Sequence, residues 1–249
     1  MLFQQINFTN EVNNLKFYYD HNIDNDYLKI PKVYDNITTD NDSIIVMEYL
    51  EGRRLTDITI DEEKDKYLMN LSKVIIKSLL IDKVFHGDMH QGNIIFMPDY
   101  KVGLIDFGIV GYVNRVEQDV YFTFFKHLHA KRIEDMTELI IDSLLEPKDI
   151  IDNLSQNKID DLTNRLILFL NKILSDKNTL SFPELNEIGI MLKKYKLYLS
   201  KNFCKFELSM ACNEGVINYL SVLEPHPFNY LSTAVTKLFP EDILSIIDF

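Results

Sequence analysis

Two short segments, HGDMHQGN at residues 86–93 and LIDFG at residues 104–108, limit what this chain can fold into more than any other feature. Asn93 follows Asp88 by five residues, and Asp106 follows Asn93 by thirteen. Between them the apolar runs NIIFM and KVGLI flank Pro-Asp-Tyr, a pattern that predicts a β-hairpin. The sequence therefore predicts two acids and an amide held by one hairpin and the loop that precedes it.

These three residues have the chemistry of a phosphoryl-transfer site of the protein-kinase type. Asp88 is the candidate catalytic residue, which would orient the acceptor hydroxyl and take its proton. Asn93 and Asp106 are the candidate Mg²⁺ ligands, because magnesium prefers a few hard oxygen donors and lets phosphates complete its shell. Each segment alone also fits an ordinary loop, but together their order and spacing favour ATP and Mg²⁺ as cofactors.

The hydrophobic pattern predicts an α+β chain whose strands lie in its first half. Helices are expected at residues 8–20 and 60–83, and strands at PKVY (31–34) and SIIVMEYL (43–50), joined by the polar turn TTDND. Beyond residue 116 the pattern predicts only helices, near 116–130, 133–146, 158–175, 183–201, 203–221 and 227–248. A boundary near Gly52 would separate a small lobe at residues 1–52 from a large, mainly helical lobe at residues 53–249.

The first lobe offers two further candidate sites for the nucleotide. The strand VMEYL runs into Glu51-Gly52, so the backbone carbonyl of Glu48 and the amide of Leu50 are candidates to face the adenine base. Glu11 lies on the first predicted helix, where kinase-like sites place the partner of the phosphate-binding lysine. Standing alone, Glu11 also fits a solvated helix charge, and VMEYL also fits an ordinary strand end.

Composition excludes several classes of function. A net charge of −12 argues against nucleic acid as a partner. No apolar run reaches the roughly 18 residues that a membrane span needs, and no targeting segment is evident. The two cysteines, Cys204 and Cys212, predict buried thiols and not a disulfide framework. We expect a soluble cytoplasmic protein that can associate peripherally with a membrane.

A metal-hydrolase site is the main alternative for the central segment. His86, Asp88 and His90 alternate, and such spacing can chelate zinc or a pair of metal ions. No further ligand cluster follows, apart from His127 and His129 on a predicted helix, where ordinary surface or core histidines are expected. The kinase-type interpretation accounts for more of the pattern.

The chain resembles the UbiB/ADCK (aarF-type) family of atypical kinases. The resemblance rests on FTNEVNNLKFY, PKVY, VMEYLEGRRLTDI, FHGDMHQGNIIF and LIDFGIVGYV, with a weaker match at ACNEGVINYLSVLEP. It implies a protein-kinase-like fold, ATP with Mg²⁺, and a link to quinone or isoprenoid lipid metabolism. It also implies that Glu11 pairs with the phosphate lysine, that Asp88 is the catalytic-loop acid, and that Asn93 and Asp106 hold the metal.

The chain departs from that family at its start. No lysine precedes Glu11, and the nucleotide-covering loop is absent, so the N-terminal lobe is expected to be reduced. One expectation is an ATP-dependent phosphotransferase or ATPase in which a second polypeptide supplies the missing part, or which works weakly without it. The alternatives are a catalytically weak or inactive nucleotide-binding scaffold, and a small-molecule kinase of the aminoglycoside or choline type.

Overall fold

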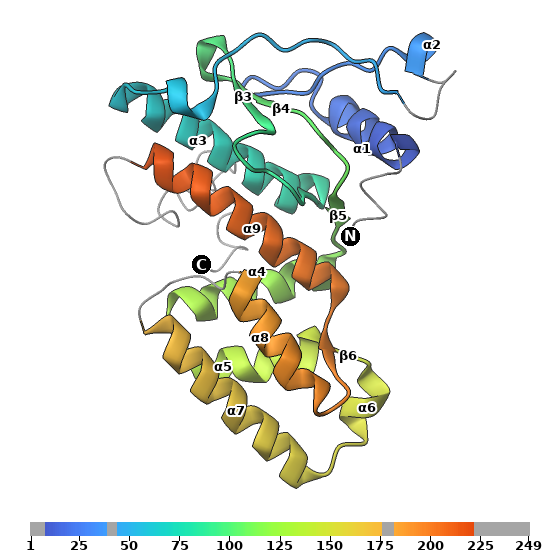
Figure 1. The fold of residues 1–249 in the computed structure, drawn as a ribbon, viewed down its shortest axis with the longest axis vertical. Helices are drawn as coiled ribbons and strands as arrows, with labels where there is room; N and C mark the ends of the chain where they lie inside the picture. The colour runs from blue at the N-terminus through green and yellow to red at the C-terminus, as the bar shows by residue number, and fades with distance from the viewer. Residues whose placement is uncertain (1–7, 39–43, 176–181, 222–249) are drawn as a thin grey trace, which may run out of the picture. The chain divides into compact units, whose positions relative to one another are not determined.

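The computed structural model describes residues 8–38, 44–175 and 182–221. The chain forms two compact units, which are described separately. Unit 1 comprises residues 1–112 and 212–249, and unit 2 comprises residues 113–211. Figure 1 shows the elements of both units. The lobe boundary expected near Gly52 stays a prediction.

Unit 1 contains two long helices, both predicted from the sequence. Helix α1 (Phe8–His21) and helix α3 (Asp61–Lys77) match the segments expected at residues 8–20 and 60–83. Acidic residues fill the first turn of α3, where the helix dipole favours negative charge. The shorter helical segments are α2 (Asp35–Thr38), the 3₁₀ turns η1 (Leu55–Asp57) and η3 (Pro98–Tyr100), and the π-helical η2 (Ser78–Asp82), which continues α3.

The predicted hairpin is confirmed as part of a three-stranded sheet with the order β1-β4-β3. Strand β3 (Ile94–Phe96) pairs antiparallel with β4 (Val102–Leu104), and β1 (Leu28–Lys29) pairs parallel with the other edge of β4. A second, two-stranded sheet, β2 (Val84–His86) with β5 (Val110–Tyr112), was not predicted. It flanks the two motif segments, because β2 leads into Asp88 and β5 follows LIDFG.

The two strands expected at residues 31–34 and 43–50 are reduced to one antiparallel bridge between Val33 and Met47. Tyr34 N–H donates to the Val46 carbonyl at 2.8 Å, so the two segments do pair where expected. Immediately after Tyr34 the chain turns into α2, and the Thr38 hydroxyl oxygen accepts from the Val46 amide at 3.0 Å. This helical turn ends the ladder. Most of the predicted turn, residues 39–42, lies outside the described residues.

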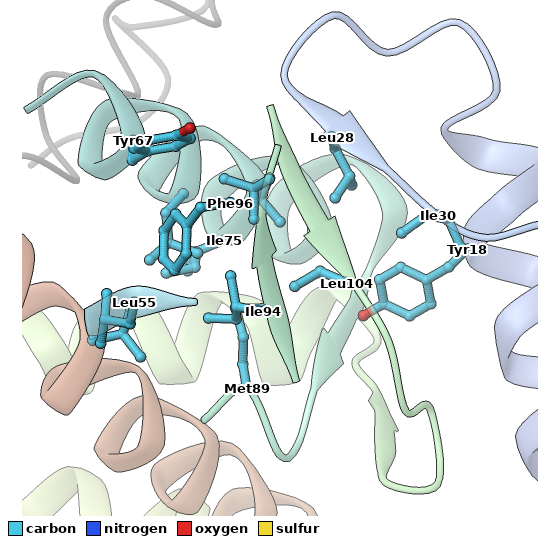
Figure 2. Packing of buried hydrophobic residues seen from close by; sticks show 14 of the residues in the cluster. Tyr18, Leu28, Ile30, Leu55, Tyr67, Ile75, Met89, Ile94, Phe96 and Leu104 are labelled. Atoms are coloured by element: carbon cyan, nitrogen blue, oxygen red, sulfur yellow. The ribbon is translucent and has the colours of Figure 1, made fainter. Parts of the chain in front are cut away.

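The core of unit 1 surrounds β3 and β4. Figure 2 shows Phe96 and Ile94 of β3 in one cluster with Ile75 of α3, Leu104 of β4 and Tyr18 of α1. All five side chains are at most 7% exposed. Burial of this apolar surface is the main force that holds α1 and α3 on the strands that carry the motifs.

Unit 2 is mainly helical, as expected, but it also contains a short sheet. Strand β6 (Leu145–Glu146) pairs antiparallel with β7 (Tyr198–Leu199), which corrects the prediction of helices alone. The expected helix 183–201 ends early because Lys196 has a positive φ of 61°, a conformation that stops helices. The helices are α4 (Arg115–His129), α5 (Ile133–Leu139) with the π-helical η4 (Ile140–Leu144), α6 (Lys148–Asp152), α7 (Gln156–Leu174), α8 (Phe182–Lys193) and α9 (Lys201–Leu220), whose last residues belong to unit 1.

The helix predicted at residues 227–248 lies outside the described residues. Within the part of the chain that the structure describes, no helix combines the length and apolar character needed to cross a membrane.

Candidate functional site

Strand β2 delivers the first motif segment and ends at His86, one residue before Gly87. The Gly87 amide donates to the Ile109 carbonyl at 2.8 Å, and a Cβ at Gly87 would overlap the Ile109 side chain. This close approach requires glycine and fixes the start of the loop. The backbone amide of Asp88 then donates to Nδ1 of His86 at 3.2 Å.

His86 is therefore a structural residue of the loop and not an exposed ligand. Its side chain is buried, and burial lowers the pKa of the ring, partly opposed by the charges of Asp106 and Asp88. A neutral ring is consistent with Nδ1 acting as an acceptor. Asp88 itself is partly exposed, and its Oδ2 lies 3.8 Å from Nε2 of the exposed His90.

Asn93 connects the loop acid to the hairpin. Its side-chain Nδ2 donates to the backbone carbonyl of Asp88 at 2.9 Å, while its own carbonyl accepts from the Ile105 amide at 3.0 Å. Ile105 immediately precedes Asp106, so the three candidate residues lie in one connected backbone network. The amide nitrogen only donates, so Oδ1 is the atom of Asn93 that can bind a cation, and the hydrogen bond from Nδ2 to the loop restrains its direction.

Asp106 has a backbone conformation that non-glycine residues seldom adopt. Its φ is 64°, in the left-handed region. The carboxylate Oδ1 accepts from the Gly108 amide at 3.1 Å, which closes a tight turn after β4. The side chain is exposed, whereas Phe107 is fully buried. The turn thus anchors Phe107 in the core and presents the Asp106 carboxylate to solvent.

Glu11 of α1 lies close to this turn. Partial burial raises the pKa of its carboxyl, the charge of Asp106 raises it further, and a hydrogen bond from the Phe107 backbone opposes both. None of the groups that shift its pKa is a lysine or an arginine. The structure thus brings Glu11 and Asp106 close enough for their charges to interact.

The donor pair formed by Asn93 and Asp106 fits Mg²⁺ in its chemistry. Carboxylate and amide oxygens are the hard ligands that magnesium accepts, and it keeps positions for phosphate oxygens and water. Among the described residues, no group of three or more His, Cys, Asp or Glu side chains could hold a metal ion by itself. The nucleotide phosphates would therefore have to supply part of the shell. Bound there, Mg²⁺ would neutralise phosphate charge.

The role expected of the backbone at Glu48 and Leu50, to face the adenine base, stays a prediction. Leu50 is buried and packs against Gly103 of β4, where a Cβ would lie 2.9 Å from its Cδ1. The backbone amide of Glu48 donates to the Lys32 carbonyl at 2.8 Å, and its side chain pairs with Lys29 at 3.0 Å. Burial raises the pKa of the Glu48 carboxyl, but the hydrogen bonds that the carboxylate accepts from Lys29 and, at 3.1 Å, from the Lys32 amide outweigh burial and hold this pKa below its usual value.

The metal-hydrolase alternative has no structural support among the described residues. His86 is buried and His90 is exposed, with Nδ1 of His90 accepting from the Gly92 amide at 2.9 Å. Cys204 and Cys212 are free thiols, as the sequence predicts, but both are half-buried and not buried. A surface hollow of about 580 Å³ lies between the loop after α1 and two lysines of α3, and none of the candidate site residues lines it.

The sequence analysis missed three residues that join α1 to the motif turn. Asn14 donates to the Phe107 carbonyl at 2.9 Å, Tyr112 donates to Oδ1 of Asn14 at 3.1 Å, and the ring of Tyr18 lies 4.9 Å from that of Phe107. Helical spacing from Glu11 could have identified Asn14 and Tyr18, since residues three and seven positions further on share its face. No local signal identifies Tyr112.

Comparison with known proteins relates the chain to kinase-like proteins. The ABC1 atypical kinase-like domain matches residues 1–140. The chloroplast protein ACTIVITY OF BC1 COMPLEX KINASE 1 of Arabidopsis thaliana is 29% identical over 123 residues, which are 48% of this chain and 18% of that protein. A Vibrio vulnificus protein named "Probable protein kinase UbiB" is 28% identical over 135 residues, 51% of this chain and 24% of that protein.

A longer alignment joins the chain to an uncharacterized aarF domain-containing chloroplast kinase of Arabidopsis thaliana, 24% identical over 218 residues, 86% of this chain and 30% of that protein. These alignments span less than a third of each relative. A solved structure, the complex of Rv3197 with erythromycin from Mycobacterium tuberculosis, matches 87% of this chain and 55% of its own, with a TM-score of 0.53 and 14% identity. That likeness concerns the fold alone. Since the family match covers more than half of its 249 residues, the chain belongs to the ABC1 atypical kinase-like family.

Proposed function

We propose that this chain binds ATP with Mg²⁺ and acts as an atypical kinase or ATPase. Asp88 would orient the acceptor hydroxyl, Asn93 and Asp106 would hold the metal, and the backbone around Glu48 and Leu50 would face the adenine. The observation that carries the proposal is the network in which Asn93 bonds to the Asp88 carbonyl and to the residue before Asp106. Positioning and charge neutralisation are most of what phosphoryl transfer asks of a protein.

Glu11 supports a further part of the proposal. A half-buried carboxylate beside Asp106 is unfavourable unless a cation lies nearby, and no described lysine or arginine contributes to its pKa. We propose that a lysine from a second polypeptide pairs with Glu11 when nucleotide binds. Without that lysine the chain would bind nucleotide more weakly, since one such phosphate contact is commonly worth about 3 kcal/mol.

A scaffold that binds nucleotide without turnover is the second candidate, and the observation that favours it is that no lysine or arginine is among the groups that shift the pKa of Glu11. Membership in the ABC1 family favours both candidates over a small-molecule kinase. The family resemblance is the basis for the proposed link to quinone or isoprenoid lipid metabolism. Composition is the basis for the proposed cytoplasmic location and peripheral membrane association.

A thermal-shift titration with ATP tests the proposal. The melting temperature should rise at millimolar ATP with Mg²⁺ and rise less with ATP and EDTA, because Mg²⁺ joins the phosphates to Asp106. In Asp106→Asn the difference between the two conditions should disappear. Asp99→Asn, a change of the same kind in the exposed turn η3, is the matched control and should keep the difference.

Two results would count against this function. Absence of any stabilisation at millimolar ATP, with or without Mg²⁺, contradicts nucleotide binding by this chain. An unchanged Mg²⁺ effect in Asp106→Asn removes Asp106 from the metal ligands. Binding without hydrolysis or transfer, also after addition of a lysine-bearing partner, would favour the scaffold.

A further inference from the structure

One face of helix α1 contacts Phe107 in three different ways. The Phe107 backbone amide donates to the Glu11 carboxylate, its carbonyl accepts from Nδ2 of Asn14 at 2.9 Å, and its ring lies 4.9 Å from that of Tyr18. Residues 11, 14 and 18 follow helical spacing, so they lie on one face of α1. The helix therefore binds the peptide groups on both sides of Phe107 as well as its side chain.

These contacts bear directly on Asp106, the residue before Phe107. A non-glycine residue at a φ of 64° costs free energy and persists only where its surroundings determine the conformation. The turn's own hydrogen bond, from the Gly108 amide to Oδ1 of Asp106, is local and links only the ends of the turn. Fixing both peptide planes at Phe107 adds the long-range restraint that the turn itself lacks.

Tyr112 sets the direction of the Asn14 amide. Its hydroxyl donates to Oδ1 of Asn14 at 3.1 Å, which leaves Nδ2 as the atom that faces the Phe107 carbonyl. Tyr112 is the last residue of β5 and lies opposite Val84 of β2, the strand that leads to the motif loop. Its ring also packs edge-on against Phe17 of α1 at 5.9 Å.

We propose that Asn14, oriented by Tyr112, is a positioning residue that holds the Asp106 turn in the conformation needed to bind Mg²⁺. This role requires no contact between Asn14 and the metal or the nucleotide. Asn14 acts through the Phe107 carbonyl, so the seating of α1 sets the metal affinity of the site. The test of this inference by metal affinity rests on the proposed function, whereas its test by hydrogen exchange does not.

The test compares Asn14→Leu with Asn13→Leu. Asn13 is exposed on the same helix, one position away, so the second variant controls for the loss of an asparagine and the gain of a leucine. The first readout is the affinity for a fluorescent ATP analogue at 10 mM Mg²⁺ divided by that in EDTA. We expect Asn14→Leu to lower this ratio by about tenfold, the worth of one well-placed hydrogen bond, with the EDTA affinity within about twofold of wild type.

Two further variants separate positioning from simple folding. Asn14→Gln keeps an N–H donor and should recover part of the ratio, and Tyr112→Phe should lower it by about threefold because it only loosens the amide. The second readout needs no nucleotide: hydrogen exchange of the peptide spanning residues 104–112. In Asn14→Leu the amides of residues 104–112 should exchange faster than in Asn13→Leu. The amides of α3 should exchange at the same rate in both variants.

The outcomes separate this inference from the function on which it rests. If wild type shows no Mg²⁺ effect on nucleotide binding, the proposed function fails and the exchange comparison alone decides the role of Asn14. Equal exchange in the two leucine variants overturns the inference. An equal affinity ratio in these two variants also overturns it, provided that wild type responds to Mg²⁺. A loss of affinity in EDTA as large as the loss in Mg²⁺ also overturns it, because the defect would then be general.

Discussion

Glu207 is a buried acid outside the candidate site, and it shows what a single carboxyl group can do to stability. It lies on α9 with 2% of its surface exposed, and its Oε1 has no hydrogen-bond partner among the described residues. Burial raises the pKa of Glu207 from 4.5 to about 8. The carboxyl is therefore neutral in the folded protein at pH 7 and charged in the unfolded chain.

This difference predicts a pH dependence of folding. Between pH 4.5 and about 8 the folded state holds a proton that the unfolded state has released. The contribution of Glu207 is thus fully present below pH 4.5 and declines by up to about 1.4 kcal/mol per pH unit until the folded group ionises. Glu207→Gln should remove this decline, so that the variant gains stability over wild type as pH rises to 8.

Urea unfolding at several pH values from 5 to 9 measures the effect. Glu138→Gln, on the exposed face of α5, is the matched control and should follow the wild-type profile. A constant difference between Glu207→Gln and wild type across this range would show that the carboxyl titrates normally in the folded protein.

At the scale of elements, the β2–β5 pair depends on a glycine more than on side-chain pattern. A Cβ at Gly111 would overlap the ring of Phe85, which is 5% exposed and lies directly opposite on β2. Gly111→Ala should therefore destabilise the protein by about 1–3 kcal/mol, as overpacked cores do. Measured melting temperatures should fall by several degrees.

Gly215→Ala is the matched change in the same unit. Gly215 is exposed within α9, and a Cβ there would meet no atom within 4 Å. Alanine favours a helix interior over glycine by roughly 0.5–1 kcal/mol, so this variant should be more stable than wild type. Equal melting temperatures for the two variants would contradict the packing argument at Gly111.

The sequence predicts those helices and strands whose residue pattern can be recognised within one continuous segment. Helices α1, α3 and α7 are long enough to show an apolar stripe, and the β3–β4 hairpin has a short connection. The strands of β2–β5 and β6–β7 have only two or three residues each, too few to show an alternating pattern, and their partners lie far along the chain. Pairing at such distances follows from the tertiary fold.

The candidate site divides in the same way. Asp88, Asn93 and Asp106 are recognisable because their spacing along the chain reflects one loop and one hairpin. Asn14 was not predicted because its partner Phe107 is 93 residues away. Nothing in the sequence around a helical asparagine indicates such a distant contact. Glu11 was a candidate only through the family resemblance and kinase-site geometry.

At the scale of the whole molecule, the proposed chemistry belongs to unit 1. Residues 11, 48, 50, 88, 93 and 106 all lie within it, and unit 2 supplies none of them. Unit 2 has a core of its own, in which α7 buries Leu162, Leu166, Leu170 and Leu174. A ligand stabilises the part of a protein whose opening destroys its site. ATP with Mg²⁺ should therefore protect unit 1 more than unit 2.

Hydrogen exchange measured with and without ATP·Mg²⁺ tests this division. Amides of α1 and of strands β3 to β5 should exchange more slowly with the ligand, by a factor that grows with ATP concentration, whereas amides of α7 should change little. The matched control is ATP with EDTA, in which the protection near Asp106 should be smaller. Equal protection of α1 and α7 would mean that the two units open together, because a ligand held by one unit can slow exchange in the other only through a shared unfolding step.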